Sequence, residues 1–515
     1  MYIKTTKATQ MMLLAAFALA LFCGCADGYE SPDGFDLGVR NTQMKTPEQQ
    51  DITFTVSTDG STATLSWPLV AGAGGHEVTF TNVDNPENPV IIDGYDKKIV
   101  DGSKFTVHIA EDSKYQLTMR TLGNKELGNT DDPETRSYNY STLVPSVATI
   151  PNGSDISQFL TENPITYSED EVAIELEPGG NYTMSSPIDF NKQKITFRGD
   201  KITRPIVKFV GNAHFETYTM LKLKYINFDL SESTAEGVIA MTKDSLPDSI
   251  KSENRGYTRS GNPIKGIYVN TEPIYIAHCW FKNLPHAMLY DNCVNCAFWS
   301  FTLSDCIVQM RNDTKSSIGF INLYKAGKSV KNITLENSTI YNTVDNASAC
   351  FVRYQNESNS QPDKVFGDNT PGSATHAWTF HNCTFVKCYY DDTTHSGWRF
   401  INNVKVSYGF TLNIDHTIFY NVSQLYRMTN SGTRTYRFNF FWNDGEDDQK
   451  RNRSSKDSSG APFASEYNPN FRGNTTQELD LSKPNGGIDF TPQEYQISSN
   501  NGGDPRWLET AQSAE

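Results

Sequence analysis

One short pattern occurs six times between residues 224 and 422, and it limits the folds open to this chain more than any other feature. A polar residue is followed by a residue that is mostly Cys, Ser or Thr, then by any residue and a large apolar anchor. The segments are Tyr225–Phe228, His278–Phe281, Asp305–Val308, Asn337–Ile340, Asn382–Phe385 and His416–Phe419. Consecutive anchors lie between 27 residues (Phe281 to Val308) and 53 residues (Phe228 to Phe281) apart. This spacing is too irregular for a helical solenoid and suits stacked coils of strands with loops of variable length.

The repeat also predicts which residues face the core, because side chains alternate between the two faces of a strand. In the second segment Cys279 and Phe281 point inward, whereas His278, Trp280 and Lys282 point outward. Cysteine in the small position is therefore expected to be a compact core residue. The other cysteines in this position are Cys306 and Cys383.

Asparagine follows the apolar anchor by two positions in three segments. These residues are Asn283, Asn342 and Asn421. Asn tolerates left-handed turns, and its amide can bond an equivalent Asn in the next coil. We therefore expect a partial Asn ladder along one corner of the coils.

The N-terminal residues have the features of a secreted, lipid-anchored protein. Lys4 and Lys7 precede an apolar run over 11–22 that is too short to cross a bilayer. Cys23-Gly24-Cys25 resembles a bacterial lipobox, which implies a signal peptide over 1–24 and a lipid on Cys25. Residues 25–46 form an acidic tether, placed like the export signal of surface lipoproteins in Bacteroidetes; the alternative is a solvated linker facing the periplasm.

The composition of the chain argues against nucleic acid and a structural metal as binding partners. The 515 residues carry a net charge of -15, so the chain lacks the basic stripe that nucleic-acid binding needs. Cys293 and Cys296 form a CxxC without a second pair at zinc spacing, which disfavours a structural metal site.

Residues 47–148 show short alternating strands separated by Gly, Asn and Asp clusters. Trp67 and Tyr115 are placed like the core Trp and the corner Tyr of a fibronectin type III sandwich, which this segment resembles. The resemblance implies a spacer that holds the second domain away from the membrane.

Residues 150–510 continue the coil pattern. The opening segments Ile174–Tyr182, Pro187–Phe190 and Ile195–Asp200 alternate strands with Gly-bearing turns, and they resemble the first coils of right-handed parallel β-helices of the pectate lyase type. The predicted fold class is therefore all-β, a fibronectin type III-like sandwich followed by a right-handed parallel β-helix with a C-terminal cap. Together these features resemble surface lipoproteins of Bacteroidetes within the pectate lyase superfamily, which tend to be encoded beside polysaccharide-utilisation genes.

Three polar stretches are too long for coil turns and are expected to project as loops, at 242–264, 355–376 and 444–468. The segments 489–492 and 503–507 are expected to strap across the C-terminal end, because an open end exposes strand edges.

Three arginines lie between apolar residues after consecutive anchors. The segments are Val352-Arg353-Tyr354, Trp398-Arg399-Phe400 and Tyr426-Arg427-Met428. Alternation turns each Arg outward, and coils stack about 4.8 Å apart, so the pattern predicts an Arg ladder on one face. Unit charges ~5 Å apart repel by roughly 1 to 3 kcal/mol at effective dielectrics of 20 to 80, so the ladder needs anions. Those anions are either carboxylates of a polyuronate or Asp391, Asp392 or Asp415 of the chain itself.

Tyr341 and Tyr420 share an outward register, with Val386 between them. Aromatic faces beside cations suit sugars that carry carboxylates, although exposed Tyr on strands is common. The candidate carbohydrate-binding residues are Arg353, Arg399, Arg427, Tyr341 and Tyr420.

A lyase acting on uronates needs a base and a neutralised carboxylate, commonly through Ca²⁺ with an Arg or Lys as base. Arg399 or Arg353 would be the base, and Asp391 and Asp392 the calcium ligands. Polygalacturonase motifs are absent, since Gly-His occurs only as Gly75-His76.

Three functions follow. The leading hypothesis is an outer-membrane, surface-exposed lipoprotein that binds an acidic plant polysaccharide of pectic type, with a glycan transporter as a partner. The alternatives are a Ca²⁺-dependent polysaccharide lyase and a structural or adhesive surface protein.

Overall fold

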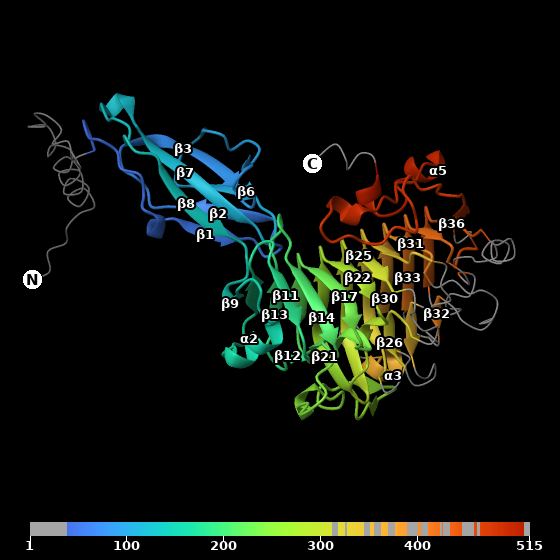
Figure 1. The fold of residues 1–515 in the computed structure, drawn as a ribbon. Coiled ribbons are helices and arrows are strands. Elements are labelled where there is room, and N and C mark those ends of the chain that lie inside the picture. Colours follow the sequence, from blue (N-terminus) through green and yellow to red (C-terminus); the bar gives the residue numbers. More distant parts are fainter. Residues whose placement is uncertain are drawn as a thin grey trace, which may run out of the picture. The chain divides into compact units, whose positions relative to one another are not determined.

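The structure, a computed structural model, describes residues 39–311, 318–324, 327–344, 351–354, 362–368, 376–388, 400–402, 410–422, 425, 433–444, 458–460 and 464–508. The chain divides into two compact units, residues 1–143 and 144–515, and each is built mainly of strands (Figure 1). The expected signal peptide and Cys25 lie outside the described residues. Within the described ranges, no helix is long and apolar enough to cross a bilayer.

The first unit is a sandwich of two antiparallel sheets. One sheet has the order β1-β2-β6, and the other has the order β4-β3-β7-β8 with β5 beside β3. The strands are β1 (Thr53–Val56), β2 (Thr62–Ser66), β3 (Ala73–Asn82), β4 (Val90–Ile91), β5 (Lys98–Val100), β6 (Lys104–His108), β7 (Lys114–Gly123) and β8 (Arg136–Ser141). Trp67 and Tyr115 both lie in the core, and the Tyr115 hydroxyl accepts a hydrogen bond from the backbone N–H of Ala110 (2.6 Å).

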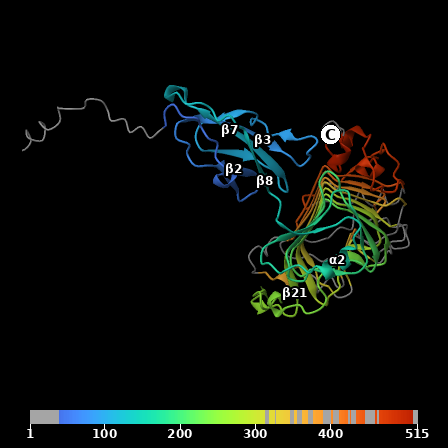
Figure 2. The ribbon, with the colours of Figure 1, turned by 60° about the vertical axis from the view of Figure 1, so that its left-hand side comes forward.

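The second unit is a parallel β-helix, as the repeat predicted. Figure 2 looks into the coils, where three sheets surround one core. The first sheet contains β9 (Ser146–Ile150), β10 (Val172–Leu176), β13 (Ile195–Arg198), β16 (Leu221–Lys224), β21 (Tyr268–Ala277), β24 (Cys296–Ser304), β27 (Val330–Glu336), β30 (His376–His381), β33 (Phe410–Asp415) and β35 (Thr433–Arg437).

The other two sheets follow the same coils. The second sheet contains β11 (Asn181–Met184), β14 (Ile206–Gly211), β17 (Asn227–Ser233), β22 (Trp280–Leu284), β25 (Ile307–Met310), β28 (Thr339–Tyr341), β31 (Thr384–Val386), β34 (Ile418–Tyr420), β36 (Phe440–Trp442) and β37 (Ser465–Glu466). The third sheet contains β12 (Ile188–Asp189), β15 (Phe215–Glu216), β18 (Gly237–Ala240), β23 (Ala287–Tyr290), β26 (Ile321–Leu323), β29 (Val352–Tyr354) and β32 (Ile401–Asn402).

The predicted inside and outside positions are confirmed. Cys279 and Phe281 are fully buried in the main core, while His278, Trp280 and Lys282 are half-buried on the outside. The anchors form stacks along the axis, such as Phe228 on Phe281 and Phe385 on Phe419. The cysteines in the small position, Cys279, Cys306 and Cys383, all lie in this core.

The polar residue that opens each repeat has a left-handed backbone and forms the corner between the first and second sheets. These residues are Tyr225, His278, Asp305, Asn337, Asn382 and His416, with φ between 47° and 58°, and Phe438 takes the same conformation (φ 51°) in the next coil. Side chains of neighbouring coils contact each other along this corner: Tyr225 stacks on His278 (4.9 Å between ring centres), and Asn382 Nδ2 donates to Asn337 Oδ1 (3.1 Å).

The Asn ladder was therefore predicted at the wrong corner. Asn283 and Asn421 do adopt left-handed conformations, with φ of 57° and 51°. However, Asn283 Nδ2 donates to Ser231, and Asn421 Nδ2 donates to Asp444. The side chains of Asn382 and Asn337 do bond each other, because these two residues are in register in adjacent coils.

Short helices and loops lie at the N-terminal end and on the outside of the coils. The helix α2 (Ile156–Glu162) lies at the N-terminal end of the β-helix, and Ile156 joins its core (Figure 1). The stretch 242–264 carries a short hairpin of β19 (Thr258–Arg259) and β20 (Asn262–Pro263), which contacts α3 (Pro362–Phe366) through Arg259 and Asp363 (2.8 Å). Most of the other two expected loops, 355–376 and 444–468, lies outside the described residues.

The C-terminal strap, residues 467–508, covers the outer face of the second sheet. It contains α5 (Tyr495–Ser498) and two short 3-10 turns, Pro484–Gly487 and Pro505–Trp507. The segments 489–492 and 503–507 were expected to close the end of the β-helix. This location was wrong, because they lie on the outer face of the second sheet. Outward positions of the second sheet are apolar, namely Ile307, Tyr341 and Val386, and the strap buries them under its own side chains Leu479, Ile488, Phe490 and Trp507.

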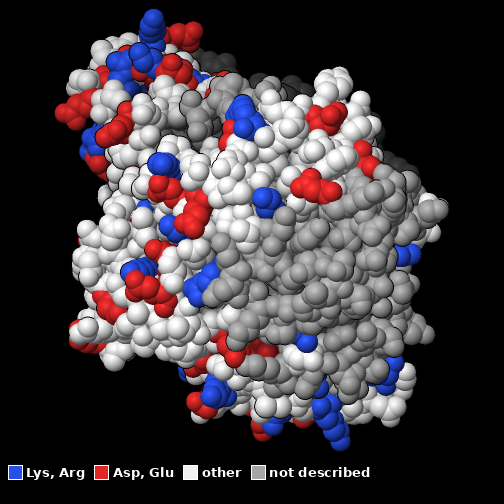
Figure 3. Space-filling model, turned by 45° about the vertical axis from the view of Figure 1, so that its right-hand side comes forward, with Lys and Arg blue, Asp and Glu red and all other residues white. Residues whose placement is uncertain are grey.

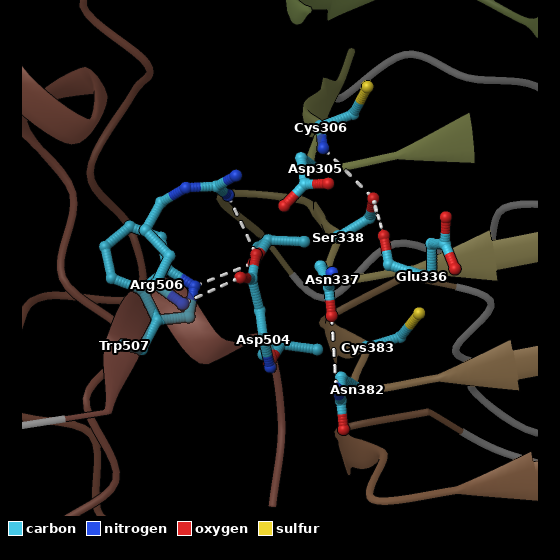
Figure 4. Close-up of polar contacts among 12 residues, drawn as sticks. Asp305, Cys306, Glu336, Asn337, Ser338, Asn382, Cys383, Asp504, Arg506 and Trp507 are labelled. Atoms are coloured by element: carbon cyan, nitrogen blue, oxygen red, sulfur yellow. Dashed lines mark hydrogen bonds and ion pairs between the residues drawn. The ribbon is translucent and has the colours of Figure 1, made fainter. Parts of the chain in front are cut away.

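Polar contacts fix the strap in register (Figure 4). Asp504 is 1% exposed; its Oδ2 accepts from Thr339 Oγ1 (2.7 Å), and its backbone N–H donates to Thr384 Oγ1 (2.9 Å). Trp507 Nε1 donates to the same Thr339 oxygen (2.7 Å), and Arg506 Nη1 donates to Asp504 Oδ2 (2.8 Å). The strap is thus bound to two adjacent strands, β28 and β31.

Candidate functional site

The outer face of the third sheet carries one row of side chains in register. Strand pairing aligns Asp189, Glu216, Ala240, Tyr290, Asn322 and Arg353 across six successive strands from β12 to β29. They alternate with the core row that includes Phe215, Ile239 and Val352, so alternation turns them away from the core. The row runs along the axis of the helix, one side chain for each coil.

A depression of about 590 Å³ opens at the start of this row. Its lining combines hydrogen-bond acceptors with donors from several coils. The lining residues are Pro187, Asn212, His214, Glu216, Glu236, Lys243, Tyr290, Asp291, Asn292 and Val294. We call it the sheet pocket.

Glu216 is the centre of the sheet pocket. Its Oε1 accepts a hydrogen bond from Asn292 Nδ2 (2.6 Å) and lies 2.9 Å from His214 Nε2, and its Oε2 accepts from the backbone N–H of Lys243 (3.3 Å). These partners come from three different coils. The carboxylate is therefore held in place before any ligand binds.

His214 lies between a backbone carbonyl oxygen and the Glu216 carboxyl group. His214 Nδ1 lies 2.7 Å from the carbonyl oxygen of Asn212, so this nitrogen carries a hydrogen, because a carbonyl only accepts. His214 Nε2 faces the Glu216 carboxyl oxygen at 2.9 Å, which also needs a hydrogen between the two atoms. The pair thus places an exchangeable proton beside the pocket.

Tyr290 forms the wall next to this pair. It is 5% exposed, and its ring meets the His214 ring edge-on, 5.6 Å between centres. Burial raises the pKa of the Tyr290 hydroxyl, so it stays protonated and can donate. No hydrogen bond joins this hydroxyl to another residue that the structure describes, which leaves it to a ligand in the pocket it lines.

Arg353 lies farther along the row and is not exposed as predicted. It does alternate with the core residues Val352 and Tyr354, but it is only 7% exposed, and its guanidinium lies 3.5 Å from the centre of the Tyr324 ring. The arginine is thus packed against an aromatic ring on the outer face instead of facing solvent.

The predicted Arg ladder also has the wrong register. The sequence aligned Arg399 with Arg353, but strand pairing places Asn402 beside Arg353 and Ile401 beside Val352. The sequence aligned Phe400 with Tyr354. In the structure Phe400 stacks on Phe351 instead, so the alignment of the two segments is shifted by three residues. Arg399, Arg427 and the candidate calcium ligands Asp391 and Asp392 lie outside the described residues.

The two predicted tyrosines belong to the second sheet, and the strap covers them to different degrees. Tyr341 is fully buried against Phe490, so the expectation of an exposed ring was wrong. Tyr420 is half-buried; its ring contacts Phe471 of the strap, and its hydroxyl donates to Asp444 (3.2 Å). Both tyrosines point outward from their strands, but they are not fully exposed to solvent because the strap packs on them.

Among the described residues, one group has the composition of a metal site. Ligand atoms of His381, Asp415 and His416 lie within 4.8 Å of one another, and His381 Nδ1 is 2.5 Å from Asp415 Oδ1. Cys293 and Cys296 are buried in the main core instead, and burial raises the pKa of the Cys293 thiol to about 11, which disfavours the thiolate that a metal needs.

Sequence reasoning did not single out the sheet pocket. The segment Ala213-His214-Phe215-Glu216 alternates polar and apolar residues, so it could have placed His214 and Glu216 on one outer face. Tyr290 and Asn292 gave no such signal, because their proximity to Glu216 depends on strand pairing across a loop of variable length.

On the face shown in Figure 3, acidic and basic side chains are interspersed over the described surface, without a continuous stripe of one sign.

Two family models match parts of the chain. Residues 3–181 match the model of a domain of unknown function, DUF4992, and residues 180–343 match that of another, DUF4957. None of the curated proteins matches the chain. Among solved structures, the PL6 family alginate lyase AlyGC is 13% identical with a TM-score of 0.33, over 64% of this chain and 40% of that enzyme. The chain thus spans less than half of the length of that lyase.

Two further solved structures are similar at lower TM-scores. Pectate lyase PelI from Erwinia chrysanthemi, in complex with tetragalacturonic acid, is 10% identical with a TM-score of 0.17, over 76% of this chain and 90% of that one. A family 28 exopolygalacturonase from Yersinia enterocolitica is 9% identical with a TM-score of 0.17, over 78% and 87%. In sequence, the chain is similar to two families of unknown function, which together cover residues 3–343.

Proposed function

We propose that this chain is a polysaccharide-binding lipoprotein of the cell surface, which holds an acidic glycan of pectic type along the outer face of the third sheet. The observation that carries the proposal is the sheet pocket, a depression of about 590 Å³ at the start of a row of side chains in register. A long polymer laid along the axis meets one side chain of this row in each coil.

The chemistry of the sheet pocket suits sugar hydroxyl groups. Carboxylates of Glu216, Glu236 and Asp291 accept hydrogen bonds, whereas Tyr290 and Asn292 donate them. An aromatic wall with a few fixed polar groups is typical of small-molecule sites. Because three carboxylates line it, the pocket suits the hydroxyl groups of a sugar ring better than a bare carboxylate.

The lipobox-like sequence at Cys25 supports attachment to the outer membrane, where a tethered sandwich would present the β-helix to polymers outside the cell. A glycan transporter in the same membrane is the partner that such a role implies. The lipid anchor rests on the N-terminal sequence, and the transporter rests on the resemblance to surface lipoproteins that are encoded beside polysaccharide-utilisation genes.

Tyr290→Ala tests the binding role. We expect it to weaken binding of oligogalacturonides by about 5- to 30-fold, since a lost hydrogen bond and ring contact are worth about 1–2 kcal/mol. Isothermal titration calorimetry on the full mature protein gives the affinity, and affinity electrophoresis extends the test to whole pectins. Tyr495→Ala is the matched control, because Tyr495 is 72% exposed and lies on the strap. Equal affinities of wild type and Tyr290→Ala would contradict the proposal.

A second candidate function is polysaccharide lyase activity. It is favoured by the contact between His214 Nε2 and Glu216 Oε1 (2.9 Å), which places an imidazole and a carboxyl group beside Tyr290 in the same pocket. Incubation with polygalacturonate and Ca²⁺, followed by ultraviolet absorbance of unsaturated products, separates the two functions. A steady rise that EDTA and Glu216→Gln both abolish would replace binding by catalysis.

A further inference from the structure

A second depression lies between the strap and the early coils, and its charge is opposite to that of the sheet pocket. It has a volume of about 580 Å³, and we call it the strap pocket. Its chemistry comes from Lys201, Arg204, Asn227, Trp280, Lys483 and Arg506.

Three separate parts of the β-helix unit build the strap pocket. Lys201 and Arg204 come from the turn between β13 and β14, and Lys483 and Arg506 come from the strap. Asn227 and Trp280 open β17 and β22 and are paired in register on adjacent coils. The strap closes over them, since Asn227 Nδ2 donates to the carbonyl oxygen of Leu481 (3.4 Å).

Four cationic residues and no acidic residue line the strap pocket. Two of the cations have carboxylate partners behind the lining: Arg506 pairs with Asp504 (2.8 Å), and Lys483 pairs with Asp480 (3.4 Å). Arg204 forms no ion pair within the part of the chain that the structure describes. Its guanidinium lies 4.9 Å from the centre of the Trp280 ring instead.

Burial and the positive charges of the strap pocket lower the pKa values of neighbouring basic groups. Burial lowers the pKa of Arg204, and the charge of Arg506 lowers it further. The field reaches the neighbouring corner, where burial lowers the pKa of His278 and the charges of Arg204, Arg506 and Lys201 act in the same direction. An anion in the strap pocket would reverse this repulsion, because opposite charges at short range favour the charged form.

Three buried polar atoms around the strap pocket lack a hydrogen-bond partner among the described residues. Asn227 is 4% exposed, and its Oδ1 has no hydrogen-bond partner among the described residues. Trp280 Nε1 and Arg204 Nη1 are also buried without a partner in the described chain. Buried polar atoms are normally paired, so these three atoms leave hydrogen-bonding capacity that a ligand in the pocket could use.

The size of the strap pocket indicates a sugar residue, not a small inorganic ion. Pockets that hold ligands of drug size have volumes of about 300–1,000 Å³, and this pocket falls in that range. Arginine binds carboxylates through paired, charge-assisted hydrogen bonds, and Trp280 offers an apolar surface to a ring.

We propose that the strap pocket binds the carboxylate-bearing sugar of an acidic glycan, so that the protein reads uronates here and sugar hydroxyls in the sheet pocket. This inference rests on the proposed polysaccharide-binding function and names the chemical class of the sugar. It places the charge recognition on the second sheet and the strap, and not in the Arg ladder that the sequence suggested.

The test compares affinities for trigalacturonic acid by isothermal titration calorimetry. The double variant Arg204→Met with Lys483→Met removes two charges while it keeps the length and apolar surface of the side chains. We expect it to bind about 10- to 100-fold more weakly, because the carboxylate loses two cationic partners at the rim of the pocket. Lys194→Met is the control, because Lys194 directly precedes β13 of the first sheet, and its side chain is 37% exposed and pairs with Glu272 (4.0 Å).

Lys483→Met alone guards against misfolding of the double variant, since the Lys483 side chain is 61% exposed. It should lower the affinity by about 5- to 10-fold, and its far-ultraviolet circular dichroism should match wild type. Wild-type affinity in the single and double variants would overturn the inference. If Tyr290→Ala alone weakens binding, the strap pocket is rejected and the proposed function stands.

Two further probes define the chemistry. A neutral trisaccharide should bind the double variant and wild type equally, and its loss in the double variant would contradict the role of charge. A sulfated trisaccharide that binds wild type more tightly than trigalacturonic acid would overturn the assignment to carboxylates. Failure of wild type to bind any of the three sugars would overturn both this inference and the proposed function.

Discussion

Replacement of Trp507 by Ala is expected to lower the free energy of unfolding of the β-helix unit by about 3–5 kcal/mol, the usual cost of removing a buried Trp side chain. Trp507 is 1% exposed and packs edge-on against Phe490, 5.7 Å between ring centres. Its Nε1 also donates to Thr339 (2.7 Å), so the variant loses a hydrogen bond as well as a ring. Urea denaturation followed by far-ultraviolet circular dichroism measures the change.

Tyr495→Ala is the control for this prediction. Tyr495 belongs to the same strap and is also aromatic, but it is 72% exposed, so its removal should change the stability by less than about 0.5 kcal/mol. Hydrogen exchange should locate the effect of Trp507→Ala in the strap and in strands β28 and β31, because the loss of one anchor favours local opening. Equal stabilities of Trp507→Ala and wild type would show that the strap does not hold the second sheet.

The second large effect is a pH dependence that Asp504 gives to the stability. Burial raises the pKa of Asp504 from 3.8 to about 6, although Arg506 and Thr339 partly oppose this rise. Between these two values the folded protein holds a proton that the unfolded chain has released. The free energy of unfolding must therefore fall as the pH rises from 3.8 to about 6.

Asp504→Asn isolates this effect, because Asn keeps the size of the side chain and does not titrate. We expect wild type to lose up to roughly 3 kcal/mol relative to Asp504→Asn across this window, at about 1.4 kcal/mol for each pH unit of pKa shift. Above the folded pKa the difference should be constant, since both states are then ionised. Urea midpoints measured at several pH values test this. A difference that stays flat, or that rises with pH, would contradict a raised pKa at Asp504.

The strap also explains why outward-facing residues misled the sequence interpretation. Tyr341 was correctly placed on the outer face of its strand, but it is buried because Phe490 packs on it. The residues of the strap that cover it are more than a hundred positions away in sequence. Alternation shows which face of the strand a side chain occupies, and it gives no information about what lies above that face.

The register between strands of neighbouring coils was the second feature that the sequence could not predict. Within each strand, alternation correctly placed Arg353 between two core residues, but it could not show that Asn402 and not Arg399 is its neighbour. The turns between coils vary in length, so the point at which the chain re-enters a sheet is set by packing of core side chains such as Phe351 and Phe400. The candidate Arg ladder depended on that register, whereas the identity of the core did not.

Sequence alone determined the coils of this protein, because the repeat that buries Cys279 and Phe281 is a local pattern with a period of two residues. Only the tertiary structure decided where ligands could bind. Glu216 and Tyr290 meet through strand pairing, and Arg204 meets Lys483 through the strap. Both pockets join residues from distant segments, so their geometry depends on the fold as a whole and leaves no periodic signal in the chain.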